Sequence, residues 1–169
     1  MKQLITLLCA GLISGSVAAA PPQASGGLCA EREDIYFSCQ TSLGRWVALC
    51  GGGNDKIQYR FGRVGHIELA FPGADGGRHV FRYAHYFRAG VDRIEVLFRN
   101  GGFDYAVFDY NERGSRTAGV RVASDSGGER EFKCRGGIRS RLAELEGLLP
   151  CDQDSALNLG SCPAPAEQR

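Results

Sequence analysis

IEVLFRNGGFDYAVFDY, residues 94–110, is the clearest structural signal in this chain. Large apolar residues alternate with polar ones on both sides of Asn100-Gly101, as in half-buried β-strands. Asn-Gly is the strongest short-range signal for a two-residue hairpin turn. Centring the turn there predicts the pairs Phe98 with Phe103, Val96 with Tyr105 and Ile94 with Val107. All six side chains then share one face, so the stretch predicts an antiparallel hairpin with one apolar side.

A second hairpin joins residues 55–62 to 66–72, which alternate in the same way. A three-residue loop at 63–65 supplies Gly65 for the left-handed position. This loop predicts the pairs Phe61 with Ile67, Tyr59 with Leu69 and Ile57 with Phe71, and it sets Arg60 opposite Glu68.

Strand-like patterns also occupy residues 79–88, 119–123 and 129–134. Seven or eight short strands between glycine- and aspartate-rich turns predict a mainly β protein, an antiparallel sandwich or barrel. Residues 138–149 are the exception, because Ile138 and several leucines recur there at helical spacing and Pro150 follows as a stop. We therefore expect one short C-terminal helix packed on the sheet.

Residues 1–20 have the pattern of a secretory signal peptide, with Lys2 ahead of an apolar stretch and three alanines at its end. The chain is long enough for a single core. We expect a signal peptide at 1–20, a β domain with its terminal helix at 21–150 and a disulfide-looped tail at 151–169. No later stretch approaches the roughly 18 apolar residues of a spanning helix. The sequence thus predicts a periplasmic or secreted protein without a transmembrane segment.

Removal of the signal peptide would remove Cys9 and leave six cysteines, an even number that indicates disulfides in an exported chain. The six are Cys29, Cys39, Cys50, Cys134, Cys151 and Cys162. In a third hairpin, 35–41 with 45–50, a loop of two or three residues places Cys39 opposite position 48 or 47. Neither register suits a bond between Cys39 and Cys50. Cys134 and Cys29 are then their partners, in either combination, and Cys151 pairs with Cys162.

No catalytic signature stands out. Of the three histidines, His66, His79 and His85, the last two lie about 20 Å apart along one expected strand. Residues 51–56 lack the second half of a phosphate-binding loop, no serine lies in a G-x-S-x-G elbow, and no Cys-x-x-Cys pair suggests a metal. We expect a protein that is not an enzyme, with no metal and no cofactor. A small secreted hydrolase that uses a histidine, or an envelope structural protein or ligand carrier, is the alternative.

Charge and side-chain type favour recognition of a protein. Residues 56–141 hold 16 basic against 10 acidic groups, an excess too diffuse for a nucleic-acid site. Tyrosine and arginine are enriched in interface hot spots, and polar loops on rigid sheets are common binding elements. The candidates are Arg82, Tyr86 and Arg88 on one face of the strand 79–88, and Asn111, Glu112, Arg113, Ser115 and Arg116 in a long polar loop. A solvated sheet face and an ordinary turn are the competing interpretations.

The export signal, the stapled strands, a Cys-x10-Cys near the mature start, Tyr-Arg-Phe-Gly at 59–62 and Lys133-Cys134 resemble small periplasmic proteins of Gram-negative bacteria. Among those with known roles, the chain is similar to periplasmic lysozyme inhibitors and to immunity proteins that neutralise peptidoglycan-cleaving toxins. The resemblance is architectural, covers roughly residues 35–134 and transfers no functional residue. It implies a rigid sheet whose loop plugs the cleft of a cell-wall hydrolase.

Overall fold

The computed structural model describes residues 27–53, 55–73 and 76–162. The predicted signal peptide and residues 163–169 of the predicted tail lie outside these ranges. The strands are β1 (Asp34–Thr41), β2 (Trp46–Gly52), β3 (Lys56–Arg63), β4 (His66–Phe71), β5 (Arg82–Arg88), β6 (Val91–Asn100), β7 (Phe103–Glu112), β8 (Ser115–Ser124) and β9 (Glu129–Ser140). Three short 3-10 helices are η1 (Arg78–Val80), η2 (Leu142–Leu145) and η3 (Ala156–Asn158). No helix in the described ranges has the length and apolar character needed to cross a membrane.

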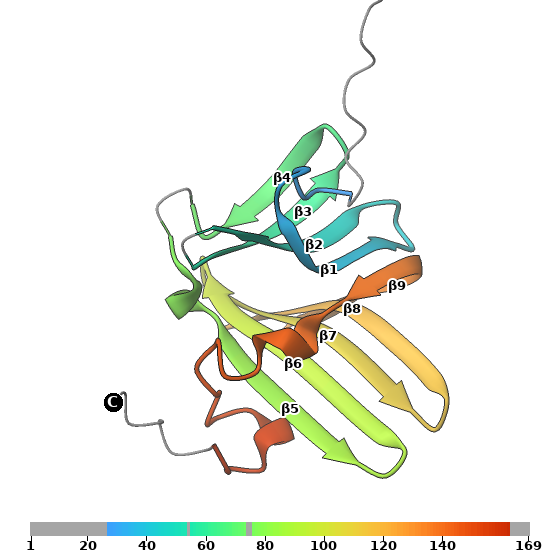
Figure 1. Cartoon of the computed structure of the whole chain (residues 1–169), viewed down its shortest axis with the longest axis vertical. Helices are drawn as coiled ribbons and strands as arrows, with labels where there is room; N and C mark the ends of the chain where they lie inside the picture. The colour runs from blue at the N-terminus through green and yellow to red at the C-terminus, as the bar shows by residue number, and fades with distance from the viewer. Residues whose placement is uncertain (1–26, 54, 74–75, 163–169) are drawn as a thin grey trace, which may run out of the picture.

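All nine strands belong to one antiparallel sheet, in the order β4-β3-β2-β1-β9-β8-β7-β6-β5 (Figure 1). The long strand β9 connects two parts, which we call the N-terminal half-sheet (β1–β4) and the central half-sheet (β5–β8). The first residues of β9, 129–133, pair with β8, and its later residues, 134–140, pair with β1. The mainly β, antiparallel fold is therefore confirmed.

The core lies between the two half-sheets, because the sheet folds over on itself. Phe98 of β6 is at its centre, with its ring 4.9 Å from those of Tyr59 and Phe71 in the N-terminal half-sheet and 5.4 Å from Phe81. Such aromatic pairs bury large apolar areas and add a favourable ring geometry. The two edge strands, β4 and β5, do not pair with each other. The structure is therefore an open nine-stranded sheet, neither a closed barrel nor two separate sheets as expected.

The predicted C-terminal helix at 138–149 is wrong. Residues 138–140 extend β9 instead, and Arg139 and Ser140 pair with β1. Only η2 is helical, and its leucines, Leu142 and Leu145, are buried in the core. A spacing of three residues also fits a 3-10 turn, in which positions i and i+3 lie on the same side. For residues 138–140, the hydrogen bonds of the strand pairing with β1 therefore stabilise the chain more than a local helix would.

The β6–β7 turn is Gly101-Gly102, one residue later than predicted. Phe98 pairs with Tyr105 and Val96 with Val107, so the predicted register is shifted by two residues along the partner strand. Both glycines have positive φ, 57° and 80°, as a two-residue turn of this class requires. Glycine adopts this conformation more readily than Asn100 does. The apolar side chains nevertheless keep their predicted common face.

The β3–β4 hairpin also differs from its predicted register. Its turn has two residues, Val64-Gly65, and a bulge next to Gly62 shifts the pairing so that Phe61 faces Leu69 and Tyr59 faces Phe71. A Cβ atom at Gly62 would lie 2.5 Å from the carbonyl oxygen of His66, so the bulge requires glycine. Arg60 faces Ala70 and not Glu68 as predicted.

Three disulfides are formed: Cys29–Cys50, Cys39–Cys134 and Cys151–Cys162. These pairings agree with the prediction, which left open whether Cys39 bonds to Cys29 or to Cys134. The partner of Cys39 is Cys134. Cys39 lies opposite Val47, as in the three-residue register of the β1–β2 hairpin, so its side chain is on the opposite face from that of Cys50. Three disulfides indicate an oxidising compartment outside the cytoplasm.

Candidate binding surface

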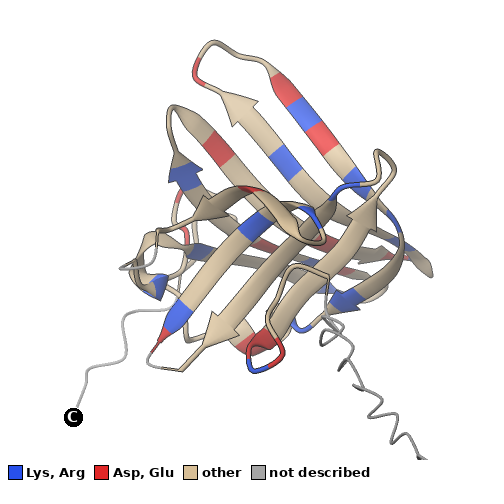
Figure 2. Ribbon diagram, turned by 90° about the horizontal axis from the view of Figure 1, so that it is seen from above, with Lys and Arg blue, Asp and Glu red and all other residues tan. Residues whose placement is uncertain are grey.

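The outer face of the central half-sheet is built from every second residue of its strands. The ladder places these residues in rows that cross the strands. The row nearest the β5–β6 and β7–β8 turns consists of Arg88, Val91, Glu112 and Ser115. The next row consists of Tyr86, Arg93, Tyr110 and Thr117. Basic and acidic residues are mixed over the sheet (Figure 2).

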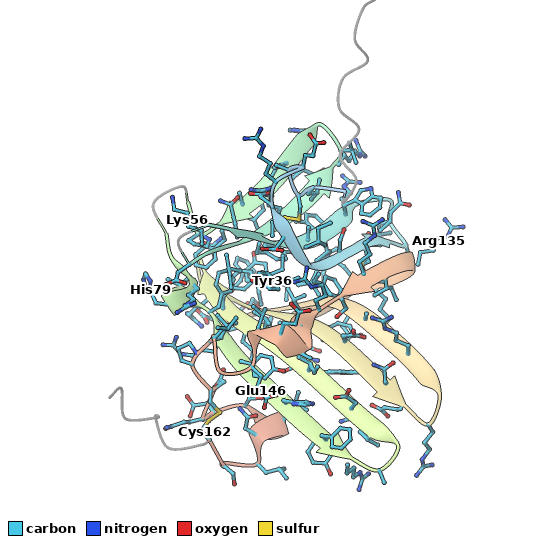
Figure 3. All side chains as sticks on the ribbon, in the orientation of Figure 1. Tyr36, Lys56, His79, Arg135, Glu146 and Cys162 are labelled. Carbon is cyan, nitrogen blue, oxygen red and sulfur yellow. A yellow bond between two sulfur atoms is a disulfide. The ribbon has the colours of Figure 1, made fainter. Side chains whose placement is uncertain are left out.

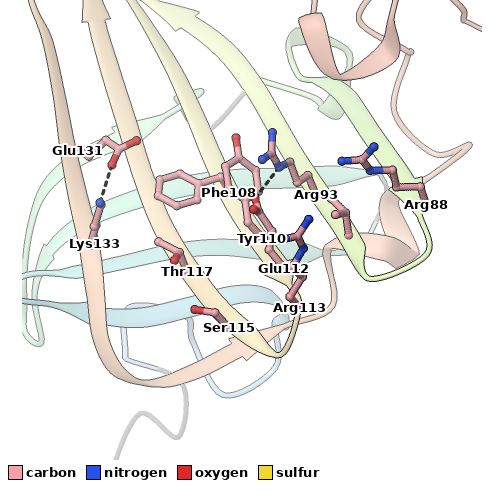
Figure 4. A pocket seen from close by; sticks show the side chains of 11 residues that line it. Arg88, Arg93, Phe108, Tyr110, Glu112, Arg113, Ser115, Thr117, Glu131 and Lys133 are labelled. Carbon is pink, nitrogen blue, oxygen red and sulfur yellow. Dashed lines mark hydrogen bonds and ion pairs between the residues drawn. The ribbon is translucent and has the colours of Figure 1, made fainter.

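A groove of about 460 Å³ lies over these two rows and extends to β9 (Figure 4). Its floor includes Phe108, which is only 1% exposed although it belongs to the outer face. Its walls carry guanidinium, carboxylate, ammonium and hydroxyl groups. Four of the eight predicted partner-binding residues line it, namely Arg88, Glu112, Arg113 and Ser115.

A buried polar network supports the floor of the groove. Glu95, 3% exposed, accepts a hydrogen bond from the Tyr110 hydroxyl and another, of 2.5 Å, from Arg121. Burial, together with the bond to Glu95, raises the pKa of Tyr110 to about 12. Burial alone would lower the pKa of Arg121, but its contacts with Tyr110 and Glu95 raise it. Both groups therefore stay protonated at neutral pH and hold the floor in place.

The charges around the groove are only partly paired. Arg93 Nε donates to Glu112 Oε1 at 2.6 Å, and Lys133 Nζ lies 3.3 Å from Glu131. Arg88 and Arg113 form no ion pair within 4.0 Å among the described residues. The guanidinium of Arg88 instead lies 5.7 Å from the centre of the Tyr86 ring. The pKa of Glu112 is lowered mainly by its bond from Arg93 and also by the nearby charges of Arg113 and Arg88. Because neither Arg88 nor Arg113 contacts a carboxylate of the described residues directly, both can contact an external anion.

The predicted long loop at 111–116 is wrong: the strands β7 and β8 are joined by the two-residue turn Arg113-Gly114. This turn is fixed to the neighbouring turn Ala89-Gly90 by a 2.8 Å hydrogen bond from the Arg113 N–H to the Gly90 carbonyl. We call these four residues the paired turns. Arg113 has φ of 48°, a left-handed conformation that arginine adopts at a cost. Unusual backbone of this kind is often retained at functional sites.

The other predicted partner-binding residues are dispersed. Asn111 and Arg116 belong to the inner face, where Arg116 makes two hydrogen bonds to Asp109 at 2.8 and 2.7 Å. Arg82 lies at the far end of β5 and donates to the carbonyls of residues 79 and 81. Tyr86 lines an adjoining hollow of about 230 Å³ next to η3. Strand alternation separates residues that are neighbours in the sequence.

Sequence reasoning missed several residues that line the groove: Arg93, Tyr110, Thr117 and Lys133. Arg93 and Tyr110 alternate with the apolar positions of the predicted 94–110 hairpin and its flank. Extending that alternation would have placed both residues on the polar face of the sheet. It would not have shown that this face contains a groove. Lys133 reaches the groove only because β9 pairs with β8.

The histidines do not form a recognisable catalytic or metal centre in the described residues. The Nε2 atom of His85 is 2.8 Å from Asp92, and its Nδ1 atom is 3.6 Å from Glu146. Both ring nitrogens therefore face carboxylates and not a nucleophile. The one group at metal-ligand spacing in those ranges is Cys29, Glu33 and Cys50, whose two sulfur atoms are already joined in a disulfide.

Comparisons of the chain with protein-family models, with curated proteins and with solved structures find no match. Its fold and its surface define a disulfide-stapled, all-β protein with a charged groove beside two tied hairpin turns. Function is therefore inferred from this groove and these turns.

Proposed function

We propose that the protein binds and neutralises another protein in the periplasm, as an inhibitor or immunity protein against a peptidoglycan-degrading enzyme or toxin. The observation that carries this proposal is the position of Arg88 and Arg113, which lie at the paired turns without carboxylate partners among the described residues. Most enzymes that hydrolyse glycosidic bonds carry two carboxyl groups in their cleft. Arginine matches a carboxylate with two parallel hydrogen bonds.

The paired turns are well suited to enter such a cleft. They end four neighbouring strands, of which β6 and β7 are hydrogen-bonded on both sides, and they are tied to each other through Arg113 and Gly90. A preorganised element loses little conformational entropy on binding. At the same end of β5, but on the opposite face from Arg88, the ring of Phe87 is 73% exposed, and exposed aromatic residues are common anchors in protein interfaces.

The proposed location rests on two observations. The disulfides indicate an oxidising compartment, and residues 1–20 have the composition of a signal peptide. Determining the N-terminal residue of protein isolated from a Gram-negative periplasm tests the second; a chain that begins at Met1 would contradict it.

The test of function is inhibition of peptidoglycan hydrolysis. Clearing of a peptidoglycan suspension by periplasmic hydrolases would be followed while the oxidised protein is titrated in. We expect inhibition at near-equal stoichiometry, and a loss of about 100-fold or more when Arg88→Glu and Arg113→Glu are combined. Arg63→Glu is the matched control, because Arg63 is an exposed arginine next to the β3–β4 turn. Undiminished inhibition by the double variant would refute the role of the paired turns.

A small hydrolase is the second candidate, and the 2.8 Å contact between His85 and Asp92 is the observation that favours it. A carboxylate that orients a histidine is part of many hydrolytic sites. If the protein itself cleared peptidoglycan with turnover, and His85→Ala abolished this activity, the inhibitor proposal would fail. A carrier of apolar ligands is disfavoured because packed rings, such as Phe98 against Tyr59, fill the core between the half-sheets.

A further inference from the structure

Strand β8 has an unpaired stretch next to the groove. It pairs with β7 over its whole length, from Ser115 to Ser124, but with β9 only from Gly119 to Ala123. Beyond Lys133, β9 turns away from β8 and pairs with β1 (Figure 1). Residues 115–118 of β8 therefore have a strand on one side only.

The backbone groups that face the open side can be assigned from the ladder. A two-residue turn makes Glu112 and Ser115 a hydrogen-bonded pair, so Ser115 and Thr117 direct their N–H and C=O groups towards β7. Arg116 and Ala118 direct theirs to the side that β9 has left. Residues 115–117 are exposed, whereas Ala118 is buried, so the open side is accessible at Arg116. Unpaired strand edges of this kind accept another strand.

The corresponding edge of β5 is covered by the protein itself. The N–H of Tyr83 donates to the Pro150 carbonyl, and the Tyr83 carbonyl accepts from the N–H of Asp152, both at 2.9 Å. The N–H of His85 donates to the side chain of Asn158. The chain thus protects β5 and leaves the end of β8 open beside the groove.

Basic groups lie at both ends of the open stretch, together with Glu112 opposite Ser115 and Glu131 beside Lys133. Arg113 precedes it at the paired turns, and Lys133 lies on β9 where the ladder with β8 ends. Arg135 projects outward from β9 a little further along (Figure 3). On the outer face, the hydroxyl groups of Ser115 and Thr117 line the groove. A strand added here would place every second side chain beside these hydroxyls, between Arg113 and Lys133.

We propose that the partner contributes an extended, acidic segment that pairs with β8 at residues 115–117. This inference rests on the proposed function and specifies how the partner is held. Backbone hydrogen bonds to the N–H and C=O groups of Arg116 supply affinity, and Asp or Glu at alternate positions supplies specificity. The arrangement is β-strand addition next to the paired turns.

The probe is a blocked synthetic peptide in which Glu and Val alternate, titrated into the oxidised protein and followed by NMR. We expect a shift of the Arg116 amide. Arg116→Pro removes an N–H from the open edge, where proline is tolerated, and should weaken binding by about tenfold or more. Arg116→Ala is the matched control, because it loses the same bonds to Asp109 but keeps the N–H. It should bind within about twofold of the unmodified protein.

Three results would overturn the inference: equal binding by Arg116→Pro and Arg116→Ala, equal binding of a peptide in which Lys replaces Glu, or no binding of the Glu-Val peptide to the unmodified protein. If Arg116→Pro does not fold, the amide shifts of the unmodified protein decide alone. Inhibition of a hydrolase is measured separately, so strand addition can fail while the proposed function stands. If the protein showed neither peptide binding at β8 nor inhibition of a hydrolase, both the strand-addition inference and the proposed function would be refuted.

Discussion

The outer faces of the two half-sheets differ in what covers them. On the N-terminal half-sheet, residues 27–33 lie over β2 and β3, fastened by the Cys29–Cys50 disulfide. Arg60 secures this cover with bonds of 2.6 and 2.7 Å to Glu33 and of 2.8 Å to the Leu28 carbonyl. On the central half-sheet, the corresponding face carries the groove and is left open.

The residues at the outward positions explain the difference. In the N-terminal half-sheet these include Trp46, Ala48 and Cys50, which form a small second apolar cluster with residues 28 and 29. A covering segment removes these apolar side chains from water, and this burial stabilises the folded protein. In the central half-sheet the outward positions include Arg93, which is paired with Glu112, and Tyr110, whose hydroxyl is bonded to Glu95, so polar partners within the sheet take the place of a cover. One sheet thus has a covered outer face on its N-terminal half and an open one on its central half.

The largest effect is expected where the half-sheets are joined. Cys39–Cys134 links β1 to β9 across 95 residues, and changing both to Ala should cost about 4–5 kcal/mol of the free energy of unfolding. Cys151–Cys162 spans only 11 residues, and its removal should cost roughly 3 kcal/mol. Urea unfolding without reductant measures both. An equal or smaller loss for the first pair would mean that the ladder alone holds the half-sheets together.

The next largest loss of stability is expected in the buried polar network under the groove of the central half-sheet. Glu95→Ala leaves Arg121 without its buried partner and should cost about 3 kcal/mol. The pKa of Tyr110 should fall below about 12, because the carboxylate that helps to raise it is gone. Urea unfolding and ultraviolet titration of the tyrosine measure these changes. Glu112→Ala is the control: its ion pair with Arg93 is exposed to solvent, so its removal should change the free energy of unfolding far less than Glu95→Ala does.

The cover of the closed face should respond to pH. Burial raises the pKa of Glu33, but the bonds from Arg60 and from the Ala30 N–H outweigh it, so the pKa lies below its usual 4.5. A lowered folded pKa stabilises the protein above the unfolded value, and this contribution disappears as the pH falls through the folded one. Arg60→Ala should cost about 2 kcal/mol at neutral pH and progressively less in acid. A difference that stays constant with pH would contradict this.

The smallest effect separates stability from binding at the paired turns. Arg113→Asn places a residue that tolerates φ of 48° before Gly114, as turns of this class favour. We expect a gain of up to about 1 kcal/mol in urea unfolding, together with weaker inhibition of the hydrolase. Arg63→Asn is the control, because Arg63 is exposed next to the β3–β4 turn. Loss of stability in Arg113→Asn would show that the arginine is retained for structural reasons.

Strand alternation and cysteine counting were sufficient for the local features of this protein. The faces of Phe98, Val96, Tyr105 and Val107 were predicted correctly although their register was not, because a shift of two residues preserves the face. The hairpin geometry of Cys39 also excluded a bond to Cys50.

Only the tertiary structure decided the remaining features. The pairing of residues 138–140 with β1 replaced a helix that the leucine spacing favoured. The bond from Arg113 to Gly90 joined two turns that are far apart in the sequence, and the departure of β9 opened the edge of β8. The physical reason is that side-chain alternation is a local property of the backbone. Turn position, sheet closure and the location of a groove depend on contacts between distant segments.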